Sequence, residues 1–363
     1  MSDAPDRDRV RWGILGTGWA ASMFATTLAK VRAAKLVSVA SRDLKRAEAF
    51  SASYRIPRAY GDYESLASSG ELDAVYIGTP VFAHHQHAVL CLTRKKAVLC
   101  EKPVAMTAAE ASAIAETAQR EGVFCMEAMW TRFLPAITRA RELVRAGEVR
   151  QPRLIRADLG FRQRQDSNNR LLLPHYGGPF LDLGVYPISI IYFFFGAPEE
   201  VKAVVWRGAS QVDDTVVATL GYPEMIAEVV TSASTTLSNR LTIYGTGGRL
   251  TLDPPLYHPE SILLEYCSES APEQFYSRGF LHRMADRVPI LHRARLALRR
   301  GGVVASRRLT LPTVGDPTRF EIEAANECIR RGETQSPIMP LADSVAVMKI
   351  MDQIRERAEM TPC

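Results

Sequence analysis

The length, composition and charge of the chain place it among globular enzymes. Its 363 residues exceed what one ordinary hydrophobic core holds, so two domains are expected. With 47% hydrophobic residues, 23% charged residues and a net charge of only +5, the composition argues against a disordered chain or a fibre and does not indicate nucleic-acid binding.

Membrane attachment and secretion are not expected either. The richest apolar run, Ile188–Phe195, is far too short to cross a bilayer. The polar segment Met1–Arg11 does not resemble a secretory signal. The six cysteines contain no Cys-x-x-Cys pair, so neither a zinc site nor a disulfide framework is indicated, and no metal is expected. A cytoplasmic setting is therefore the expectation.

Residues 1–127 alternate predicted strands with predicted helices. The strands are Val10–Leu15, Leu36–Ala40, Ala74–Ile77 and Ala97–Cys100. The helices are Ala20–Val31, Leu44–Tyr54, His84–Thr93 and Ala108–Glu121. This alternation predicts an α/β domain of the Rossmann type, with a doubly wound parallel sheet.

Residues 128–363 have a different texture and are predicted to form a second domain. Its helices are Pro135–Ala146, a long apolar helix that ends at Phe195, Pro317–Arg330 and Leu341–Glu359. Its strands are Leu154–Phe161, Val201–Trp206, Val216–Tyr222, Ile226–Ser232, Arg240–Tyr244 and Arg249–Leu252. Consecutive strands without helices between them predict an α+β domain with an open, mainly antiparallel sheet. We expect this domain to bind the substrate and to form the oligomer. The C-terminal helix is a candidate to pack back onto the first domain.

A glycine-rich loop follows the first strand and opens the first helix. It has the pattern G-x-G-x-x-A and holds the predicted cofactor residues Gly16, Thr17, Gly18, Trp19 and Ala20. Gly16 permits the tight turn, and Gly18 lets the backbone approach a pyrophosphate. The N-terminus of the helix then offers free N–H groups to the phosphates. In this strand-turn-helix context the loop predicts a dinucleotide site.

The end of the second strand indicates which dinucleotide binds. Proteins that bind NAD usually place a carboxylate there for the ribose 2′-hydroxyl. This chain instead has Ser41-Arg42, with Lys45 and Arg46 close behind. A hydroxyl and a guanidinium suit a 2′-phosphate, so the sequence predicts NADP(H). The alternative is that Asp43 caps a helix and the basic residues are only surface.

Four motifs in order resemble the glucose-fructose oxidoreductase, inositol dehydrogenase and rhizopine-catabolism (Gfo/Idh/MocA) family. They are GTGWAA at residues 16–21, TPVFAHH at 79–85, EKP at 101–103 and GGPFLDLGVYP at 177–187. Three further segments are similar to one branch, the dimeric trans-dihydrodiol dehydrogenases and NADP-dependent D-xylose dehydrogenases. They are MEAMWTRFLP at residues 126–135, RADLGF at 156–161 and YGTGGRLTL at 244–252.

The resemblance implies roles for particular residues. Lys102 matches the EKP lysine beside the reacting carbon, Tyr186 matches the proton donor or acceptor, and Asp182 lies one helical turn before it. Many members have a histidine where this chain has Tyr186. Further cofactor contacts are implied for Thr79, Pro80, His84, Glu101, Trp130 and Arg132. Substrate contacts are expected at Phe161, His175 and Tyr176.

These side chains suit hydride transfer to or from a carbinol carbon. A proton must reach or leave the oxygen as the hydride moves, and a tyrosine does this at neutral pH only if a cation such as Lys102 stabilises its phenolate. In the reducing direction the same ammonium polarises the carbonyl. The expected enzyme is an NADP-dependent oxidoreductase that acts on a secondary alcohol or ketone of a sugar, cyclic polyol or trans-dihydrodiol. It is expected to form a homodimer or a homotetramer.

Other interpretations stay open. Lys102 alone could be a turn residue, and Tyr186 a core aromatic. A non-catalytic NADP-binding sensor on the same fold is the alternative of a different class. The segment 278–308 holds nine arginines and one acid, Asp286. We expect it to be an inserted amphipathic helix with a solvated basic face. A second interpretation is a lid that recognises an anion, which would favour a phosphorylated or nucleotide-linked keto-sugar as substrate. A third is that the segment attaches the protein to an anionic membrane surface.

Overall fold

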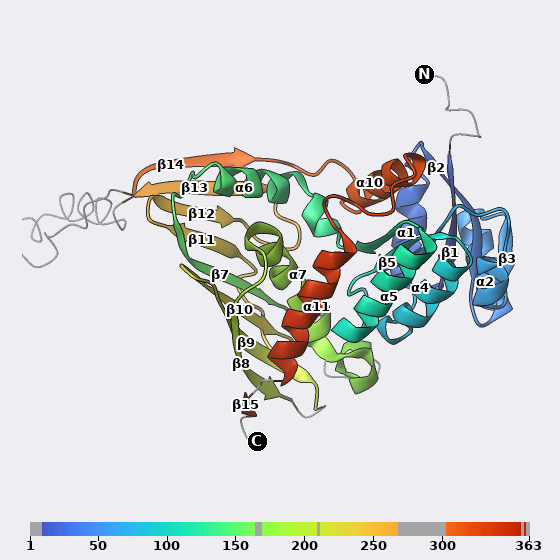
Figure 1. Ribbon diagram of the computed structural model, residues 1–363, viewed down its shortest axis with the longest axis horizontal. Coiled ribbons are helices and arrows are strands. Elements are labelled where there is room, and N and C mark those ends of the chain that lie inside the picture. The colour runs from blue at the N-terminus through green and yellow to red at the C-terminus, as the bar shows by residue number, and fades with distance from the viewer. Residues whose placement is uncertain (1–8, 164–168, 209–210, 268–302, 357–358, 361–363) are drawn as a thin grey trace, which may run out of the picture.

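The computed structural model describes residues 9–163, 169–208, 211–267, 303–356 and 359–360. Two sheets organise this part of the chain, and Figure 1 shows them side by side with helices between and around them. The expected α/β fold with a Rossmann domain and an open second sheet is confirmed.

The first sheet has six parallel strands in the order β3-β2-β1-β4-β5-β6. The order reverses between β1 and β4, which is where such sheets open a ligand crevice at the strands' carboxyl ends. The sequence did not predict β3, α3 or β6, which are short. The strands are β1 Val10–Leu15, β2 Ala34–Ala40, β3 Arg58–Tyr60, β4 Ala74–Ile77, β5 Ala97–Glu101 and β6 Cys125–Ala128. The helices are α1 Trp19–Leu28, α2 Leu44–Tyr54, α3 Tyr63–Ala67, α4 His84–Thr93 and α5 Ala108–Glu121.

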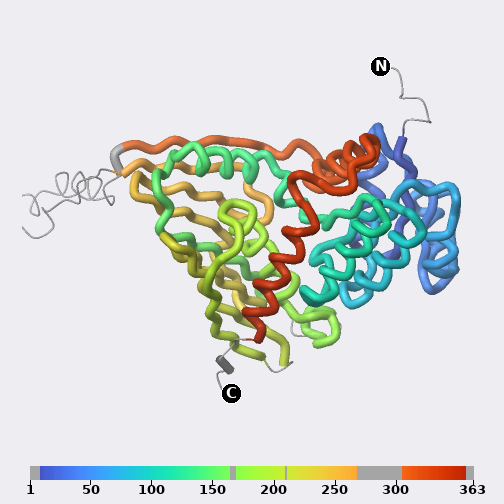
Figure 2. The backbone as a smooth tube through the Cα atoms, in the orientation of Figure 1, coloured from blue at the N-terminus to red at the C-terminus, as the bar shows by residue number. Residues whose placement is uncertain are grey.

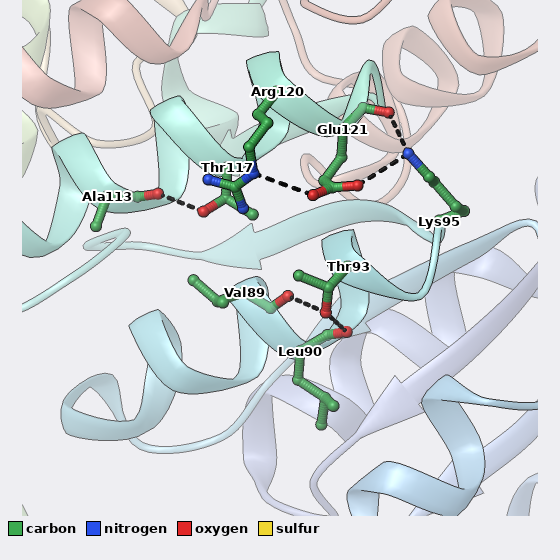
Figure 3. Close-up of polar contacts among 8 residues, drawn as sticks. All are labelled: Val89, Leu90, Thr93, Lys95, Ala113, Thr117, Arg120 and Glu121. Atoms are coloured by element: carbon green, nitrogen blue, oxygen red, sulfur yellow. Dashed lines mark hydrogen bonds and ion pairs between the residues drawn. The ribbon is translucent and has the colours of Figure 1, made fainter.

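At the amino ends of the strands, the C-terminus of α4 is hydrogen-bonded to the C-terminus of α5. Lys95 donates to the Glu121 backbone carbonyl at 2.8 Å and to its carboxylate at 2.9 Å, as Figure 3 shows. Arg120 adds a second donor to that carboxylate at 3.2 Å. A cation that reaches the last carbonyls of a helix satisfies acceptors that the helix itself leaves open. These contacts therefore lie at the opposite end of the strands from the carboxyl ends, where such sheets bind their ligands.

The second sheet has nine strands in the order β14-β13-β12-β11-β7-β10-β9-β8-β15. All neighbours are antiparallel except β7 with β10 and β8 with β15. The strands are β7 Pro152–Gly160, β8 Glu200–Arg207, β9 Asp213–Gly221, β10 Ile226–Ser232, β11 Leu241–Gly245, β12 Gly248–Leu252, β13 Ser261–Cys267, β14 Val303–Thr310 and β15 Glu359–Met360.

Strand β14 corrects one sequence-based expectation. Residues 303–308 belong to the basic segment that we expected to be helical, but they pair with β13 as a strand. The pairing places Arg308 opposite Leu263 and Arg307 opposite Leu264. Residues 278–302 of that segment lie outside the described residues. The arginines of β14 are therefore sheet-edge residues, a common place for charge in natural sheets.

Helices cover one face of the second sheet. They are α6 Pro135–Arg145, α7 Gly178–Phe195 and α11 Leu341–Glu356, and Figure 1 shows all three on the side that faces the first domain. The helical stretch Pro174–Phe195 has 22 residues and is, by length and composition alone, long and apolar enough to span a membrane. The expectation that no segment is long enough is corrected on this point. However, 78% of its apolar window is buried inside the protein. A helix that is apolar all round is what a core position between a sheet and another helix requires.

The C-terminal helices join the two halves of the molecule. Helix α10, Arg319–Arg330, packs on α1 and β1, where the Trp12 indole donates to Asn326 at 2.8 Å. Figure 2 shows α11 running between the two halves. Its Asp352 carboxylate accepts from the Ala108 backbone N–H at 2.7 Å, at the start of α5. The boundary at residues 127/128 stays a prediction, but the last two helices contact the first domain.

Arg132 is a buried structural residue. It lies in the short turn Trp130–Phe133 and is 0% exposed. Its guanidinium donates to the Ser189 hydroxyl at 2.8 Å and to the Asp343 carboxylate at 2.6 Å, and so ties the turn to α7 and α11. The predicted nicotinamide contact of Arg132 is not supported, because the side chain has no exposed surface and its donors are engaged by the core.

Replacing Arg132 by Met should therefore destabilise the fold. Removing one partner of a buried, hydrogen-bonded ion pair costs about 3 kcal/mol of the free energy of unfolding. The midpoint of urea unfolding measures the change. Arg139→Met is the matched control, because Arg139 pairs with Glu142 on the exposed side of α6 and such pairs are worth less than about 1 kcal/mol. Equal midpoints for the two variants would contradict the structural role of Arg132.

Candidate active site

A cavity of about 460 Å³ lies where the first sheet's carboxyl edge meets α7. Trp19 and Ala20 line it from the N-terminus of α1, Glu101 and Lys102 from the end of β5, and Asp182 and Tyr186 from α7. Three sequence-distant segments that were singled out for chemistry thus share one space. This is the arrangement expected of a site at the topological switch point.

The glycine loop fits a dinucleotide phosphate. Gly16 has φ +103°, and a Cβ added there would meet the Gly78 carbonyl oxygen at 2.8 Å, so the turn needs glycine. A Cβ added at Gly18 would meet nothing within 4 Å, which means that open space lies beside the first turn of α1. Among the described residues no side chain caps that helix, so its N–H groups are available to an anion.

The end of β2 is where the sequence predicted either a 2′-phosphate site or a helix cap by Asp43 with basic surface residues. Asp43 does cap α2, because its carboxylate accepts from the backbone N–H groups of Lys45 at 2.9 Å and Arg46 at 3.4 Å. The side chains of Arg42, Lys45 and Arg46 are exposed, whereas Ser41 is buried at the strand end. Capping by Asp43 leaves the basic side chains directed to solvent, so it does not exclude a 2′-phosphate at this point.

His84 positions the loop that carries Lys102. Its ring nitrogens lie 2.9 Å from the Pro103 carbonyl oxygen and 2.8 Å from the Thr79 carbonyl oxygen. The imidazole therefore connects the loops after β4 and β5, and burial lowers its pKa. The Thr79 hydroxyl is 2.9 Å from Nδ1 of His87. His84 and Thr79, which were predicted to contact the cofactor, thus hold the two loops together.

Lys102 is tied to α7. Its ammonium donates to the Asp182 carboxylate at 2.6 Å and to the Asp182 backbone carbonyl at 3.1 Å. It also lies 4.5 Å from the centroid of the Tyr186 ring. Burial opposes the charge on Lys102, but Asp182, Tyr186 and Glu101 outweigh it and raise the pKa of the ammonium. Lys102 is therefore a permanent cation at neutral pH.

The protonation state of the Tyr186 phenol differs from what the sequence suggested. Burial raises the pKa of its phenol to about 12; Lys102 lowers it, while Asp182 and Glu101 raise it further. The expected stabilisation of a phenolate by Lys102 is thus outweighed, because Asp182 takes up the ammonium and the ammonium lies over the ring. The indole of Trp130 donates to the phenol oxygen at 3.3 Å. The Tyr186 phenol is therefore neutral at neutral pH in this arrangement.

Aromatic rings form one wall of the cavity. Ring centroids of Trp130 and Tyr186 are 6.2 Å apart, those of Trp130 and Tyr257 are 6.0 Å apart, and those of Phe161 and Tyr257 are 6.0 Å apart. Phe161 was predicted to face substrate and does line the cavity. Tyr257 was missed; the only signal was the proline-rich loop at residues 253–259. Flat apolar walls of this kind suit a ring-shaped substrate.

His175 and Tyr176 lie elsewhere. Their rings pack against Phe82, with centroid distances of 5.8 Å and 5.3 Å, at the turn after β4. Neither residue lines the cavity with Lys102. The sequence also missed Tyr76, Asp316 and Glu321, which do line it. The last two lie at or just before α10, where the sequence predicted a helix but no site residue.

Comparison with known proteins supports the family resemblance. Residues 10–129 match the model of the oxidoreductase family with an NAD-binding Rossmann fold, and residues 137–251 match the GFO/IDH/MocA C-terminal domain. The trans-1,2-dihydrobenzene-1,2-diol dehydrogenase of Bos taurus is 32% identical over 362 residues, covering 97% of this chain and 98% of its own. The Mus musculus enzyme of the same name is 33% identical with the same coverage.

Solved structures share the fold over the whole chain. A 3-ketoreductase from Actinomadura kijaniata, in complex with NADP and TDP-benzene, superposes with a TM-score of 0.80 at 21% identity and covers 98% of this chain and 100% of its own. The aldose-aldose oxidoreductase from Caulobacter crescentus, complexed with glycerol, gives 0.79 at 22% identity over 96% and 97%. The chain belongs to the GFO/IDH/MocA family and is an oxidoreductase of the kind that acts on CH–OH donors, with an NAD(P)-binding Rossmann domain.

Replacing Asp182 by Asn should lower the pKa of Tyr186. The substitution removes a negative charge that disfavours the phenolate and releases the Lys102 ammonium to stabilise it. An ultraviolet difference titration of phenolate formation measures the shift. The double variant Asp182→Asn, Tyr186→Phe serves as the reference spectrum that lacks this one phenol. A pKa that stays the same or rises in the single variant would contradict the electrostatic account.

Proposed function

We propose that this protein is an NADP-dependent oxidoreductase that moves a hydride between nicotinamide C4 and a secondary alcohol or ketone carbon. The proposed substrates are a sugar, a cyclic polyol or a trans-dihydrodiol. One observation carries the proposal: Lys102, Asp182 and Tyr186 share a cavity that begins at the glycine loop. A sensor protein on the same fold would have no use for a paired ammonium and phenol at that place.

The cofactor supplies the hydride chemistry from its nicotinamide ring. Gly16, Gly18 and the N-terminus of α1 would hold its pyrophosphate, and Ser41 with Arg42 would hold the 2′-phosphate. The Lys102 ammonium would donate to the substrate oxygen and stabilise the negative charge that develops there during reduction. Tyr186, a neutral phenol at neutral pH, would give that oxygen a proton. In oxidation the same groups would act in reverse.

The substrate class rests on two supports. The relatives at 32–33% identity are named for a cyclic diol, trans-1,2-dihydrobenzene-1,2-diol. The aromatic wall of Trp130, Phe161 and Tyr257 offers flat surfaces against which such a ring, or the apolar face of a sugar, would stack. A screen of NADP⁺ reduction with dihydrodiols, inositols and aldoses, with NADPH oxidation by keto-sugars, would identify the preferred substrate.

We infer further that the protein is a homodimer or homotetramer and that it works in the cytoplasm. The face of the second sheet that α6, α7 and α11 leave open exposes Val204, Trp206, Val217 and Ile226. Apolar groups gathered on an open sheet favour contact with another protein surface. The described cysteines Cys91, Cys100, Cys125, Cys267 and Cys328 are free thiols, which suits a reducing compartment.

Replacing Lys102 by Ala should lower kcat by about 10²–10³-fold, because it removes the cation at the developing oxyanion. The dissociation constant for NADPH, measured by fluorescence titration, should change little. Tyr186→Phe should lower kcat by about 10²–10⁴-fold, because the proton donor is lost. Lys95→Ala is the control, since Lys95 lies at the opposite edge of the sheet. A kcat of Lys102→Ala close to that of the wild-type protein would refute the proposed chemistry.

Replacing Arg42 by Leu should weaken NADP(H) binding selectively. Loss of a charge-assisted hydrogen bond to phosphate costs about 1.5–3 kcal/mol, or roughly 10-fold to 150-fold in the dissociation constant. The dissociation constant for NAD(H) should stay the same. Arg94→Leu, at the far end of α4, is the control for an exposed arginine. Wild-type protein that binds NAD as tightly as NADP would overturn the proposed preference.

A further inference from the structure

Glu321 is a buried carboxyl in the wall of the same cavity. It lies on α10, is 2% exposed, and lines the cavity with Lys102 and Ala20. Its Oε2 atom is buried and has no hydrogen-bond partner among the described residues. The described residues around this oxygen thus offer it no hydrogen-bond donor of the kind that stabilises a buried carboxylate.

The titratable groups whose charge acts on Glu321 are acids. Those that act on it electrostatically are Glu101 at the end of β5, Asp316 before α10, Glu127 on β6 and the Tyr76 phenol on β4. Burial and these acids raise the pKa of Glu321 well above its usual range. Burial also raises the pKa of the neighbouring Glu101 to about 7, although Lys102 lowers it. Glu101 and Glu321 line the same cavity, and the charge of Glu101 contributes to the raised pKa of Glu321.

The cavity as a whole has an excess of acid. Within the described chain, its lining includes the carboxyl groups of Glu101, Asp182, Asp316 and Glu321, and one cation, Lys102. The charge of Lys102 is already paired with Asp182 at 2.6 Å. A ligand that brings a positive charge would complement this lining. The oxidised nicotinamide ring carries such a charge, and the reduced ring does not.

We propose that Glu321, together with Glu101, is a proton-linked binding group for the oxidised nicotinamide ring. The proposal rests on the proposed function for the presence of that ring, which NADP and NAD share. When the oxidised cofactor binds, the pair gives up one proton to solvent and the resulting carboxylate faces the cationic ring. When the reduced cofactor binds, the pair keeps its proton. The protein thus favours the oxidised cofactor more as the pH rises.

The test is the ratio of dissociation constants for NADPH and NADP⁺, measured by calorimetry with the full chain and no substrate. For one linked proton the ratio rises by up to about tenfold per pH unit between about pH 6 and pH 8. The 2′-phosphate, whose own pKa is about 6, is common to both cofactors and cancels in the ratio. Titrations in buffers of different ionisation enthalpy should show a proton released with NADP⁺ and none with NADPH.

Glu321→Gln should lower the pH dependence of the ratio, because one of the two carboxyl groups can no longer release a proton. The double variant Glu101→Gln, Glu321→Gln should make the ratio independent of pH, because neither Gln can release one. Glu323→Gln, an exposed position on the same helix, should keep the wild-type slope. A flat ratio in the wild-type protein, or a full wild-type slope in Glu321→Gln or in the double variant, would overturn the proposal and leave the proposed function standing. Failure of the wild-type chain to bind either cofactor would overturn both.

Discussion

The 2.6 Å ion pair between Lys102 and Asp182 is the interaction on which the site depends. Lys102 follows the last residue of β5 in the first domain, and Asp182 lies on α7, the core helix of the second. The pair therefore joins the two domains at the point where the cavity opens. Because only 11% of the lysine side chain is exposed, its charge has to be paired, and the pairing adds a contact between the two domains beside the cavity.

This pairing also decides the protonation states around it. Asp182 takes the ammonium away from the Tyr186 hydroxyl, so burial dominates and the phenol keeps its proton. His84, held between the Thr79 and Pro103 carbonyls, fixes the loop that aims Lys102. Around this core the lining is acidic, which leaves the cavity complementary to a cation. The site thus combines a neutral phenol, a fixed cation and several carboxyl groups within one cavity.

The sequence predicted the features that follow strand ends and left out those that depend on tertiary packing. Lys102 and the glycine loop were found because strand-turn-helix order fixes where such residues lie. Arg132 was misassigned because, only two positions from Trp130, its side chain enters the core while Trp130 faces the cavity. Tyr257 lies in a loop with no periodicity to place it. Glu321 did carry a signal, since its spacing with Ala325 and Cys328 sets it on the buried face of an amphipathic helix.

A crystal structure of the protein with bound NADPH tests the central claim most directly. The account predicts that the nicotinamide ring lies in the cavity between Ala20 and Lys102, with the Tyr186 hydroxyl open to a substrate oxygen and Arg42 at the 2′-phosphate. A nicotinamide ring held outside this cavity, or a Lys102 ammonium that has left both Asp182 and the reacting face of the ring, would contradict it.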